Sequence, residues 1–420
     1  MNVCVIGSGG REHAICYKLN QSKKLKNLYC MPGNAGTEDI CINLNVDITD
    51  FNEIYSQIKK NKIELVLVGP EIPLVEGLVD FLESKNIRIF GPSKNAAQLE
   101  GSKIFMKDMC KKFNIPTAKY CEVNSVEEAA DILNNFQEPI VVKSDGLAAG
   151  KGVTICKTKK EAMVDIKNIL EGKFSSSKRV MIEEFLDGEE ASYFVITDGK
   201  NFKQIGTAQD HKRIGENDVG LNTGGMGAYS PSLIIDNKLE KKIIDKIIIP
   251  TINGMSKLGY PYKGILYAGL IIKNGEPKLI EYNIRFGDPE CQVLMMRLKD
   301  DLIDLVNQCI DEKLNDKNLN WSPNPCITIV AASKGYPENF EKLVEIKNLP
   351  DNKKLVDQQI FHAGTLKKDS KILSNGGRVL NATVLMPTLK LAREKALDLL
   401  DKLDWENKYY RRDIGWRAIK

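Results

Sequence analysis

Short apolar runs alternate with helical spacings along the first hundred residues. Residues 3–6 and 65–68 are continuous apolar runs, which are typical of parallel strands covered on both faces. Residues 87–90 predict another short strand, and residues 12–20 carry hydrophobic positions at helical intervals. Strands that alternate with helices predict an α/β fold with a doubly wound parallel sheet, which we expect to form a Rossmann-like domain over residues 1–101.

The pattern changes from residue 102 to about 310, where we expect a larger α+β domain. Alternating residues 265–273 and 277–283 flank Asn274-Gly275, which is the strongest short signal for a β-hairpin. The polar, glycine-rich stretch 207–230 predicts a long segment without regular structure. Because such segments are uncommon inside compact domains unless they carry function, we expect functional residues in it.

Other elements of the middle region follow from the same patterns. Strands are predicted at 139–143, 153–156, 179–186, 192–197 and 202–206, and helices near 102–112 and 238–258. Two pairs, Asp50 with Glu53 and Ser125 with Glu128, have the spacing of a capping box at a helix start.

The last hundred residues predict a small C-terminal α/β domain. A polar segment with two prolines, residues 311–325, is typical of a linker. Residues 326–420 then run from a strand at 327–331 to a helix near 388–403. A chain of 420 residues is long enough for roughly three domains, which agrees with this division.

Composition narrows the class of protein. The apolar fraction of 42% and the charged fraction of 28% are ordinary for a globular chain. A net charge of +4 is too small to indicate a nucleic acid or an anionic membrane as a partner. The chain opens on a strand without a leader pattern, and no apolar run approaches the ~20 residues of a membrane span, so we expect a cytoplasmic protein.

The ten cysteines and three histidines do not suggest a zinc site. No two cysteines have CxxC spacing, most of them lie in apolar patterns, and the histidines are far apart without an HExxH motif. We therefore expect buried free thiols in a reducing compartment. The cysteines are Cys4, Cys16, Cys30, Cys41, Cys110, Cys121, Cys156, Cys291, Cys309 and Cys326.

The strand that ends at residue 283 carries the most informative polar side chains. Glu281 and Asn283 are two residues apart, so they point to the same face, and their oxygens are suitable ligands for magnesium. Arg285 follows at a distance from which it could reach anionic oxygens held by that metal. On this segment alone, an exposed polar strand end with a salt bridge is an equally good interpretation.

Two glycine-rich segments suggest phosphate binding. Residues 7–12 follow a strand and open a helix, which suits an anion, although Glu12 occupies the third glycine position of a dinucleotide fingerprint. We favour a phosphate-bearing substrate here over NAD, and rank NAD level with a simple tight turn. Residues 145–152 surround Lys151 with glycine and alanine, and Lys143 precedes them. A polyphosphate loop explains this composition better than a flexible hairpin tip.

Two further polar clusters accompany these segments. Residues 183–190 contain several acids, which form either a surface turn or a place to hold a ribose or oppose a metal. Residues 210–213 and 222–227 lie in the long polar stretch, where cations could stabilise a transferring phosphoryl group. A lone histidine such as His211 is more often structural, and we assign it no catalytic role.

Taken in order, these segments resemble the ATP-grasp ligases, and most closely the phosphoribosylamine–glycine ligase family of purine biosynthesis. The resemblance covers essentially the whole chain and is highly specific, because a generic ATP-grasp protein would not combine RFGDPE with NTGGMGAYSP. The matching stretches are VIGSGGREHA at 5–14, PGNAGT at 32–37, VGPEIPLVEG at 68–77, QLEGSK at 98–103, KSDGLAAGKGV at 143–153, EEFLDGEEAS at 183–192, QDHKRIG at 209–215, NTGGMGAYSP at 222–231, EYNIRFGDPE at 281–290, NGGRVL at 375–380 and RRDIGWRA at 411–418.

The resemblance implies an order of chemical events. ATP with Mg²⁺ or Mn²⁺ would phosphorylate the carboxylate of glycine, and the amine of 5-phosphoribosylamine would then displace phosphate to give glycinamide ribonucleotide. Because the glycyl phosphate hydrolyses readily, a lid must exclude water, and residues 121–190 are the natural lid of the ATP-grasp domain 102–310. The protein would bind only small molecules, and it would act as a monomer.

The resemblance also implies roles for individual residues, carried over motif by motif. ATP would contact Lys103, Lys143, Gly146, Gly150, Lys151, Gly152, Glu183, Glu184, Phe185, Leu186 and Glu190, with Glu184 to Leu186 around adenine and Glu190 at the ribose. The metal would be bound by Glu281 and Asn283, and the reacting phosphates would be neutralised by Arg285, Lys212 and Arg213. The glycine pocket would include Asp210, Thr223 and Gly225, and the phosphoribosyl substrate would face Gly10, Arg11, Glu71, Asp288 and Arg378.

Three other functions remain open at this point. One is an ATP-grasp ligase or carboxylase that acts on another purine intermediate. The others are an NAD-dependent oxidoreductase built on residues 1–101, against which Glu12 argues, and a nucleotide sensor without catalysis.

Overall fold

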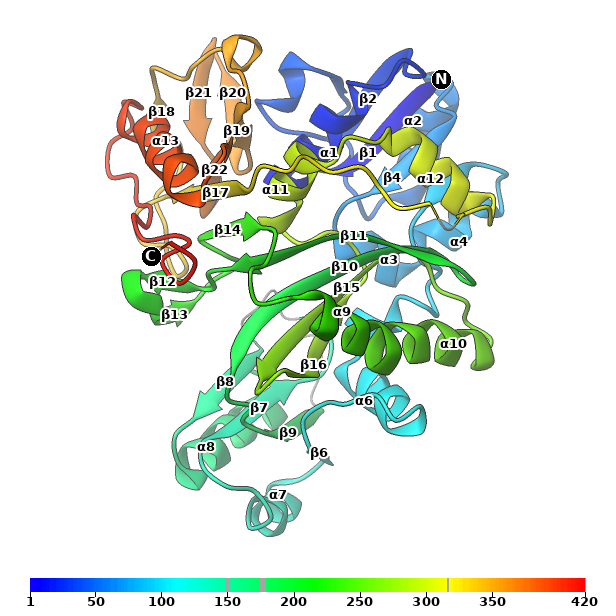
Figure 1. The fold of residues 1–420 in the computed structure, drawn as a ribbon, viewed down its shortest axis with the longest axis vertical. Coiled ribbons are helices and arrows are strands. Elements are labelled where there is room, and N and C mark those ends of the chain that lie inside the picture. The colour runs from blue at the N-terminus through cyan, green and yellow to red at the C-terminus, as the bar shows by residue number, and fades with distance from the viewer. Residues whose placement is uncertain (148–151, 174–178, 316, 420) are drawn as a thin grey trace.

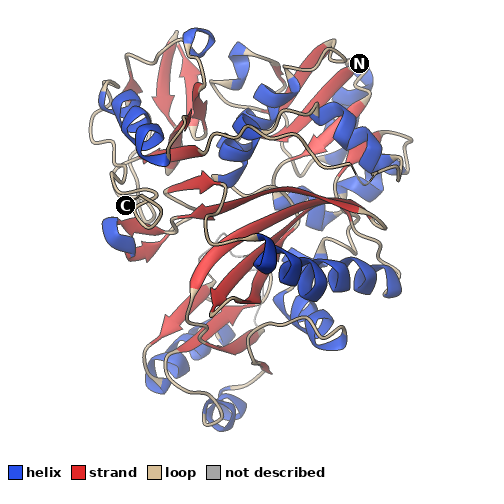
Figure 2. Ribbon diagram, in the orientation of Figure 1, coloured by secondary structure: helices blue, strands red, loops and turns tan. Residues whose placement is uncertain are grey.

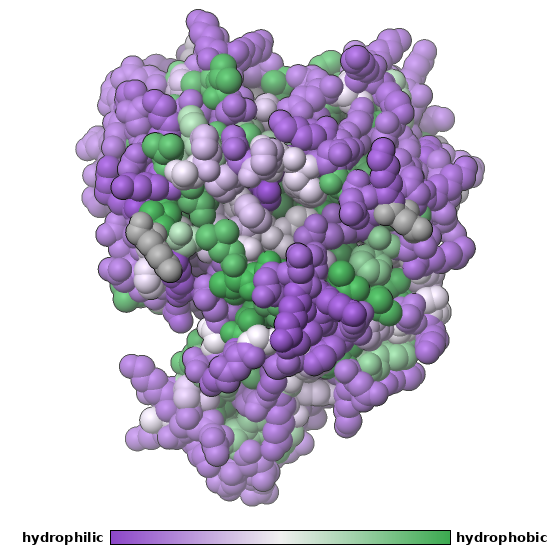
Figure 3. Space-filling model, viewed as in Figure 1, coloured by the Kyte–Doolittle hydropathy of each residue, from purple (hydrophilic) through white to green (hydrophobic). Residues whose placement is uncertain are grey.

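The computed structural model describes residues 1–147, 152–173, 179–315 and 317–419. In Figure 1 the N-terminal and C-terminal parts lie side by side above a long central sheet, and a smaller lobe projects below it. Figure 3 shows that polar side chains cover most of this face and that a notch separates the lower lobe from the body. None of the described helices is long and apolar enough to cross a membrane.

The N-terminal part is the predicted parallel sheet, in the order β3-β2-β1-β4-β5, with every pair parallel. Its strands are β1 (Asn2–Gly7), β2 (Asn27–Pro32), β3 (Ile42–Asn43), β4 (Leu65–Val68) and β5 (Arg88–Phe90). Its helices are α1 (Gly10–Leu19), α2 (Phe51–Lys60), α3 (Glu71–Glu76) and α4 (Leu78–Glu83), and α5 (Gln98–Gly101) and α6 (Lys103–Lys112) follow it. Strands β1 and β4 are buried on both faces, which explains the continuous apolar runs at residues 3–6 and 65–68.

The lower lobe is a four-stranded antiparallel sheet in the order β6-β9-β7-β8, backed by two helices (Figure 2). Its elements are β6 (Tyr120–Val123), α7 (Val126–Leu133), β7 (Ile140–Ser144), β8 (Val153–Cys156), α8 (Lys159–Leu170) and β9 (Val180–Glu184). Its hydrophobic core is separate from the others and is drawn wholly from residues 123–182. This lobe is the segment that we predict to act as a lid, and we call it the lid lobe.

The central sheet has eight strands in the order β16-β15-β10-β11-β14-β17-β22-β19, and all its pairs are antiparallel. Its strands are β10 (Glu189–Asp198), β11 (Phe202–Asp210), β14 (Gly227–Ser230), β15 (Lys263–Lys273), β16 (Glu276–Asn283), β17 (Cys326–Ala332), β19 (Gln358–His362) and β22 (Arg378–Leu385). The hairpin of β15 and β16 turns at Asn274 and Gly275, both of which have positive φ, as the sequence predicts.

Helices cover the two faces of this sheet. Tyr193 and Val195 of β10 contribute to the core on one side with α9 and α10, whereas Phe194 and Ile196 contribute to the core on the other side with α11 and α12. The helices are α9 (Asn237–Ile243), α10 (Ile249–Lys257), α11 (Glu290–Arg297), α12 (Leu302–Ile310) and α13 (Leu389–Asp401). The buried helix α11 packs against α1 as well as β11, β14, β17 and β22, so it joins all the upper parts of the molecule.

Two sequence expectations differ from the structure. The stretch 207–230 is not without regular structure, because it contains the end of β11, the hairpin of β12 (Arg213–Gly215) and β13 (Val219–Asn222), and β14. Its strand β14 pairs with β17, which lies about a hundred residues later, so no local pattern could show it. The predicted single helix at 238–258 has a π-helical turn at Ile244–Ile248, just before Pro250, whose missing N–H interrupts the α-helical bonding.

The largest strands of the C-terminal part extend the central sheet, since β17, β22 and β19 continue from β14. A small three-stranded sheet and α13 complete it. Its strands are β18 (Glu345–Ile346), β20 (Thr365–Lys368) and β21 (Lys371–Ser374). The expected buried free thiols are confirmed: all ten cysteines are free, and eight are buried.

Candidate active site

A buried carboxylate holds two lysines at the root of the lid lobe. Glu183 on β9 contacts Lys143 on β7 at 3.0 Å and Lys107 on α6 at 3.2 Å, and the side chains of all three residues are at most 5% exposed. Glu183 pairs with Val141, so it is the diagonal neighbour of Lys143 on the same face of the antiparallel sheet. We predicted Glu183 as an ATP contact, but its carboxylate is turned inward, where it positions Lys143.

The glycine-rich loop starts beside α6. Lys103 Nζ donates to the Gly146 carbonyl at 2.7 Å. Burial lowers the pKa of Lys103, although the negative charge of Glu281 acts to raise it. Asp145 accepts from the backbone N–H of Ile104 at 3.3 Å, which ties the loop to the helix start. Gly152 accepts from Ser144 N–H at 2.9 Å. Of the other loop residues predicted to bind ATP, Gly150 and Lys151 lie outside the described residues.

The segment that joins β9 to β10 carries the residues predicted to surround adenine. The Glu184 carboxylate accepts from Lys119 N–H at 3.1 Å and lies 3.3 Å from Lys278, and Phe185 is 39% exposed. Leu186 is the next residue along the same connection. The backbone of this connection therefore lies between the lid lobe and the central sheet.

Glu281 and Asn283 lie on the same face of β16, opposite Gly269 and Tyr267 of β15. Both side chains are half-buried, and neither makes a hydrogen bond to any described residue. Free carboxylate and amide oxygens in this position fit a hard divalent cation. The negative charge of Glu281 acts to raise the pKa values of both Lys103 and Lys212, so it lies within electrostatic reach of both lysines.

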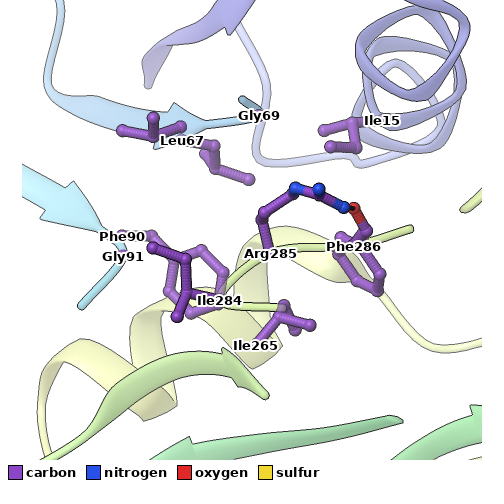
Figure 4. A pocket seen from close by; sticks show the side chains of 10 residues that line it. Ile15, Leu67, Gly69, Phe90, Gly91, Ile265, Ile284, Arg285 and Phe286 are labelled. Carbon is purple, nitrogen blue, oxygen red and sulfur yellow. Dashed lines mark hydrogen bonds between the residues drawn. The ribbon is translucent and has the colours of Figure 1, made fainter. Parts of the chain in front are cut away.

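Arg285 is held by two carboxylates that come from the N-terminal third of the chain. Its Nε donates to Glu71 at 3.0 Å and its Nη2 to Glu100 at 2.8 Å, and burial, which would lower its pKa, is outweighed by these two charges. Burial would raise the pKa of Glu71, but Arg285 and Arg11 lower it to about 2. Burial raises the pKa of Glu100 to about 7 despite Arg285. Figure 4 shows the Arg285 side chain beside a small apolar cavity lined by Leu67, Phe90 and Ile265.

Asp210 and Lys212 form a second charged cluster at the end of β11. Lys212 Nζ donates to Glu190 at 2.8 Å, which lowers the pKa of Glu190. Burial raises the pKa of Asp210 to about 7 against the attraction of Lys212. The carbonyl of Lys212 accepts from both the N–H and the hydroxyl of Thr223, and that hydroxyl accepts from Gly225 N–H at 3.0 Å. The structure therefore brings these five predicted residues together.

A cleft of about 390 Å³ opens at the N-terminal turn, between β1 and the residues before α11. Arg11 and Asp288, both predicted to face the phosphoribosyl substrate, line it. Arg378 lies 3.1 Å from Asp288 and also donates to the Gly224 carbonyl at 2.7 Å, so it joins the cleft to the loop that follows β13. Gly10 does not line the cleft; it is buried, and a Cβ there would meet Asn381 and Gln292 within 2.6 Å.

Glu12 closes the N-terminal turn from inside. Its carboxylate accepts from Gly9 N–H at 2.6 Å and from Arg11 Nε at 2.6 Å, so it takes donors that a dinucleotide pyrophosphate would need. A Cβ at Gly69 would lie 2.0 Å from the same carboxylate, which shows how tightly it is enclosed. The turn therefore does not suit NAD.

Two residues of the long polar stretch make hydrogen bonds within the fold. Arg213 donates to the Gly220 carbonyl at 2.9 Å within its own hairpin. His211 is structural, as expected: its Nε2 accepts from Gly415 N–H at 2.9 Å, and its Nδ1 is 3.2 Å from Asp218.

Sequence reasoning missed two residues that the site depends on. Glu100 was in a matching stretch but received no role, because its partner Arg285 is 185 residues away. Lys107 had a usable signal, since it lies three residues from Ile104 and from Cys110 on the apolar face of a predicted helix. A lysine on such a face needs a buried partner, which the structure supplies as Glu183.

Comparison with known families matches almost the whole chain. The sequence models of the phosphoribosylglycinamide synthetase N domain, ATP-grasp (A) domain and C domain match residues 1–100, 101–291 and 326–417. The phosphoribosylamine–glycine ligase of Brucella melitensis is 48% identical over 421 residues, covering 100% of this chain and 99% of that protein. The ligase of the same name from Haemophilus influenzae is 47% identical over 425 residues, with the same coverage.

Solved structures show the same similarity. The crystal structure of phosphoribosylamine–glycine ligase from Thermotoga maritima has a TM-score of 0.87 and 34% identity, covering 99% of this chain and 100% of that one. A biotin carboxylase from Campylobacter jejuni has a TM-score of 0.74 at 14% identity over 99% of this chain and 94% of that one, which indicates a shared fold only.

Proposed function

The chain belongs to the phosphoribosylglycinamide synthetase family, and from that premise we propose that it joins glycine to 5-phosphoribosylamine while ATP is cleaved to ADP and phosphate. The product is glycinamide ribonucleotide, an intermediate of purine biosynthesis. The observation that carries this proposal is the shared face of Glu281 and Asn283 on β16, where both side chains are half-buried and the charge of Glu281 acts on Lys103 and on Lys212. A site with that charge pattern suits a triphosphate and its cation.

The proposed residues form two groups, one that holds ATP and one beside which glycine reacts. Lys103 and Lys143 hold the phosphates of ATP on the lid side, and Glu190, paired with Lys212, holds the ribose. A carboxylate oxygen of glycine attacks the terminal phosphorus, ADP leaves, and glycyl phosphate forms next to Lys212. The amine of phosphoribosylamine then attacks the glycyl carbon, loses a proton, and releases phosphate.

The cleft at Arg11 is the proposed place for the phosphoribosyl group. Arg11 lines the cleft; its Nε donates to Glu12 and its Nη1 to the Phe286 carbonyl, so we propose that its Nη2 donates to the sugar phosphate. Asp288, held by Arg378, offers a carboxylate to the ribose hydroxyls. Arg378 also donates to the carbonyls of Gly224 and Gly225, in the loop before β14. Binding of a ligand in the cleft is therefore expected to affect the positions of Thr223 and Gly225.

We propose that Glu281 and Asn283 bind Mg²⁺ or Mn²⁺. When bound, the cation screens the charge of the phosphate oxygens and orients them. We propose that the protein acts as a monomer. We further propose that it acts in the cytoplasm, where ATP is available and its ten free thiols stay reduced.

The test of this function is ADP release by the purified protein. We expect release that requires glycine, freshly made phosphoribosylamine and a divalent cation together. Release that requires bicarbonate or another purine intermediate instead of glycine would assign the chain to a sister ATP-grasp reaction. Tight ATP binding without release under any of these conditions would indicate a sensor.

The pKa of Asp210 makes glycine binding depend on pH. We propose that the Asp210 carboxylate pairs with the ammonium of glycine. Because the pKa of Asp210 is raised to about 7, the free protein must lose a proton to bind glycine at lower pH. We expect the dissociation constant of glycine, measured by calorimetry, to rise about tenfold from about pH 8 to about pH 6.

A matched control is available for this measurement. Glu100 also has a pKa raised to about 7, so Glu100→Gln removes a titrating carboxylate outside the glycine pocket. The pH dependence is expected to persist in Glu100→Gln and to be lost, together with affinity, in Asp210→Asn. The reverse pattern would exclude Asp210 as the partner of the ammonium group.

A further inference from the structure

Three cysteines from separate segments of the N-terminal part converge on one point. Cys16 lies on α1, Cys30 on β2, and Cys41 just after the short helix Thr37–Asp39. Their three Sγ atoms all lie within 4.8 Å of one another. Cys16 and Cys30 are fully buried, whereas Cys41 is partly exposed, and none of them forms a disulfide. We call this group the thiol cluster.

The thiol cluster is unlike the other buried thiols of the chain. Within the part of the chain that the structure describes, it is the only set of three or more histidine, cysteine or acidic side chains close enough to share an ion. Cys110, by contrast, donates to the Met106 sulfur at 3.7 Å, and Cys309 donates to the Thr197 carbonyl at 3.0 Å. Packing alone would explain a single buried thiol, but it does not require three sulfurs to face one another.

The geometry suits a small thiophilic cation. For three sulfurs within 4.8 Å of one another, a point exists that is no more than about 2.8 Å from each of them. Zinc–sulfur bonds are about 2.3 Å long, so each sulfur would move by about half an ångström or less. Changes of χ1 at the three cysteines can supply such a movement without moving the backbone.

The described hydrogen bonds of the cluster are made by thiols. Cys41 Sγ donates to the Thr37 carbonyl at 3.0 Å, and Cys30 Sγ donates to the Gly7 carbonyl at 3.3 Å. Because the thiolate is the form that binds a metal ion, binding has to displace these protons.

We propose that Cys16, Cys30 and Cys41 form a binding site for a divalent thiophilic cation of the zinc class. Binding forms three sulfur–metal bonds and releases the thiol protons of Cys16, Cys30 and Cys41 to solvent. A water molecule completes the coordination on the exposed side, next to Cys41. Thiolate ligands select this class of ion over magnesium, so the site is distinct from the one at Glu281 and Asn283.

The thiol cluster is connected to the substrate cleft by a hydrogen bond. Cys30 Sγ donates to the Gly7 carbonyl at 3.3 Å, and both Gly7 and Pro32, two residues after Cys30, line the cleft. A metal ion that removes the proton from Cys30 also removes this hydrogen bond. Loading of the thiol cluster is therefore expected to change the affinity of the cleft for a sugar phosphate, and inorganic phosphate can report that change.

The experiment is a titration of the full-length protein with Cd²⁺, whose thiolate complexes absorb in the ultraviolet. We expect a saturable charge-transfer band at one equivalent of metal, competition by Zn²⁺ and no effect of Mg²⁺. Cys41→Ser is the decisive variant, since Cys41 is the only partly exposed member and its replacement should not prevent folding. It is expected to abolish the band.

Two control variants make the result unambiguous. Cys121→Ser removes the other partly exposed thiol, in the lid lobe, and should leave the band unchanged. Glu281→Gln should also leave it unchanged, which separates this site from the proposed catalytic one. Alkylation gives a second readout: Zn²⁺ is expected to protect Cys41 but not Cys121. Absence of a saturable band, or an equal band in Cys41→Ser, would overturn the proposal.

Discussion

Replacement of Glu281 by glutamine is expected to lower kcat by about a thousandfold while the fold is kept. The substitution preserves the shape of the side chain but removes the charge that acts on Lys103 and Lys212. A divalent cation at a reacting phosphate contributes several kcal/mol to the stability of the transition state, and a loss of about 4 kcal/mol corresponds to that factor. The measurement is glycine-dependent ADP release at saturating ATP over a range of Mg²⁺ concentrations.

Glu276 provides the matched control on the same strand. It lies at the exposed end of the hairpin and pairs with Lys242 and Lys246 rather than with any residue of the proposed site. We expect Glu276→Gln to change kcat by no more than about twofold, since exposed pairs contribute little. If Glu281→Gln kept full activity, or required no more Mg²⁺ than the unaltered protein, the metal role of β16 would be wrong.

Glu183→Gln is expected to destabilise the lid lobe by about 3–5 kcal/mol, the usual effect of removing one partner from a buried charge group. Glu183 is the acid that lies between Lys107 and Lys143, and without it two ammonium groups stay buried without compensation. ATP affinity should fall as well, because Lys143 loses the contact that positions it. Hydrogen exchange of residues 120–184 would show the local loss of stability.

Glu171→Gln is the corresponding control within the same lobe. Its partner Lys167 and Glu171 itself are both about 60% exposed, so its loss should change stability by less than about 0.5 kcal/mol. Adding Lys107→Met to Glu183→Gln should recover part of the stability, because it removes one uncompensated charge. Equal exchange in Glu183→Gln and Glu171→Gln would show that the buried carboxylate does not organise the lobe.

Features that depend on neighbouring residues in the chain could be predicted from the sequence. The hairpin at Asn274 and Gly275 formed as expected, since the positive φ values of its turn are specified locally. The predicted helix starts also formed: Asp50 accepts from Glu53 N–H at 2.9 Å, and Ser125 from Glu128 N–H at 3.1 Å. The shared face of Glu281 and Asn283 on β16 follows from strand periodicity alone, so the two residues could be placed together.

Features that depend on distant partners could not be predicted in this way. The inward turn of Glu183 is decided by Lys107, which comes from a helix before the lid lobe. Arg285 could be marked as a phosphate ligand, but not as the partner of Glu71 and Glu100, because tertiary packing alone brings those carboxylates to it. The thiol cluster was equally invisible, since its members are 14 and 11 residues apart, without the short spacings of known zinc motifs.

The pairing of β14 with β17 has a practical consequence for anyone who divides this chain. Residues 326–420 look like a detachable module, yet a fragment that stopped at residue 325 would leave β14 with an open row of backbone donors and acceptors. Open strand edges recruit other strands, so such a fragment should self-associate rather than behave as a shortened enzyme. The two pieces are better regarded as halves of one folding unit, to be co-expressed and not truncated.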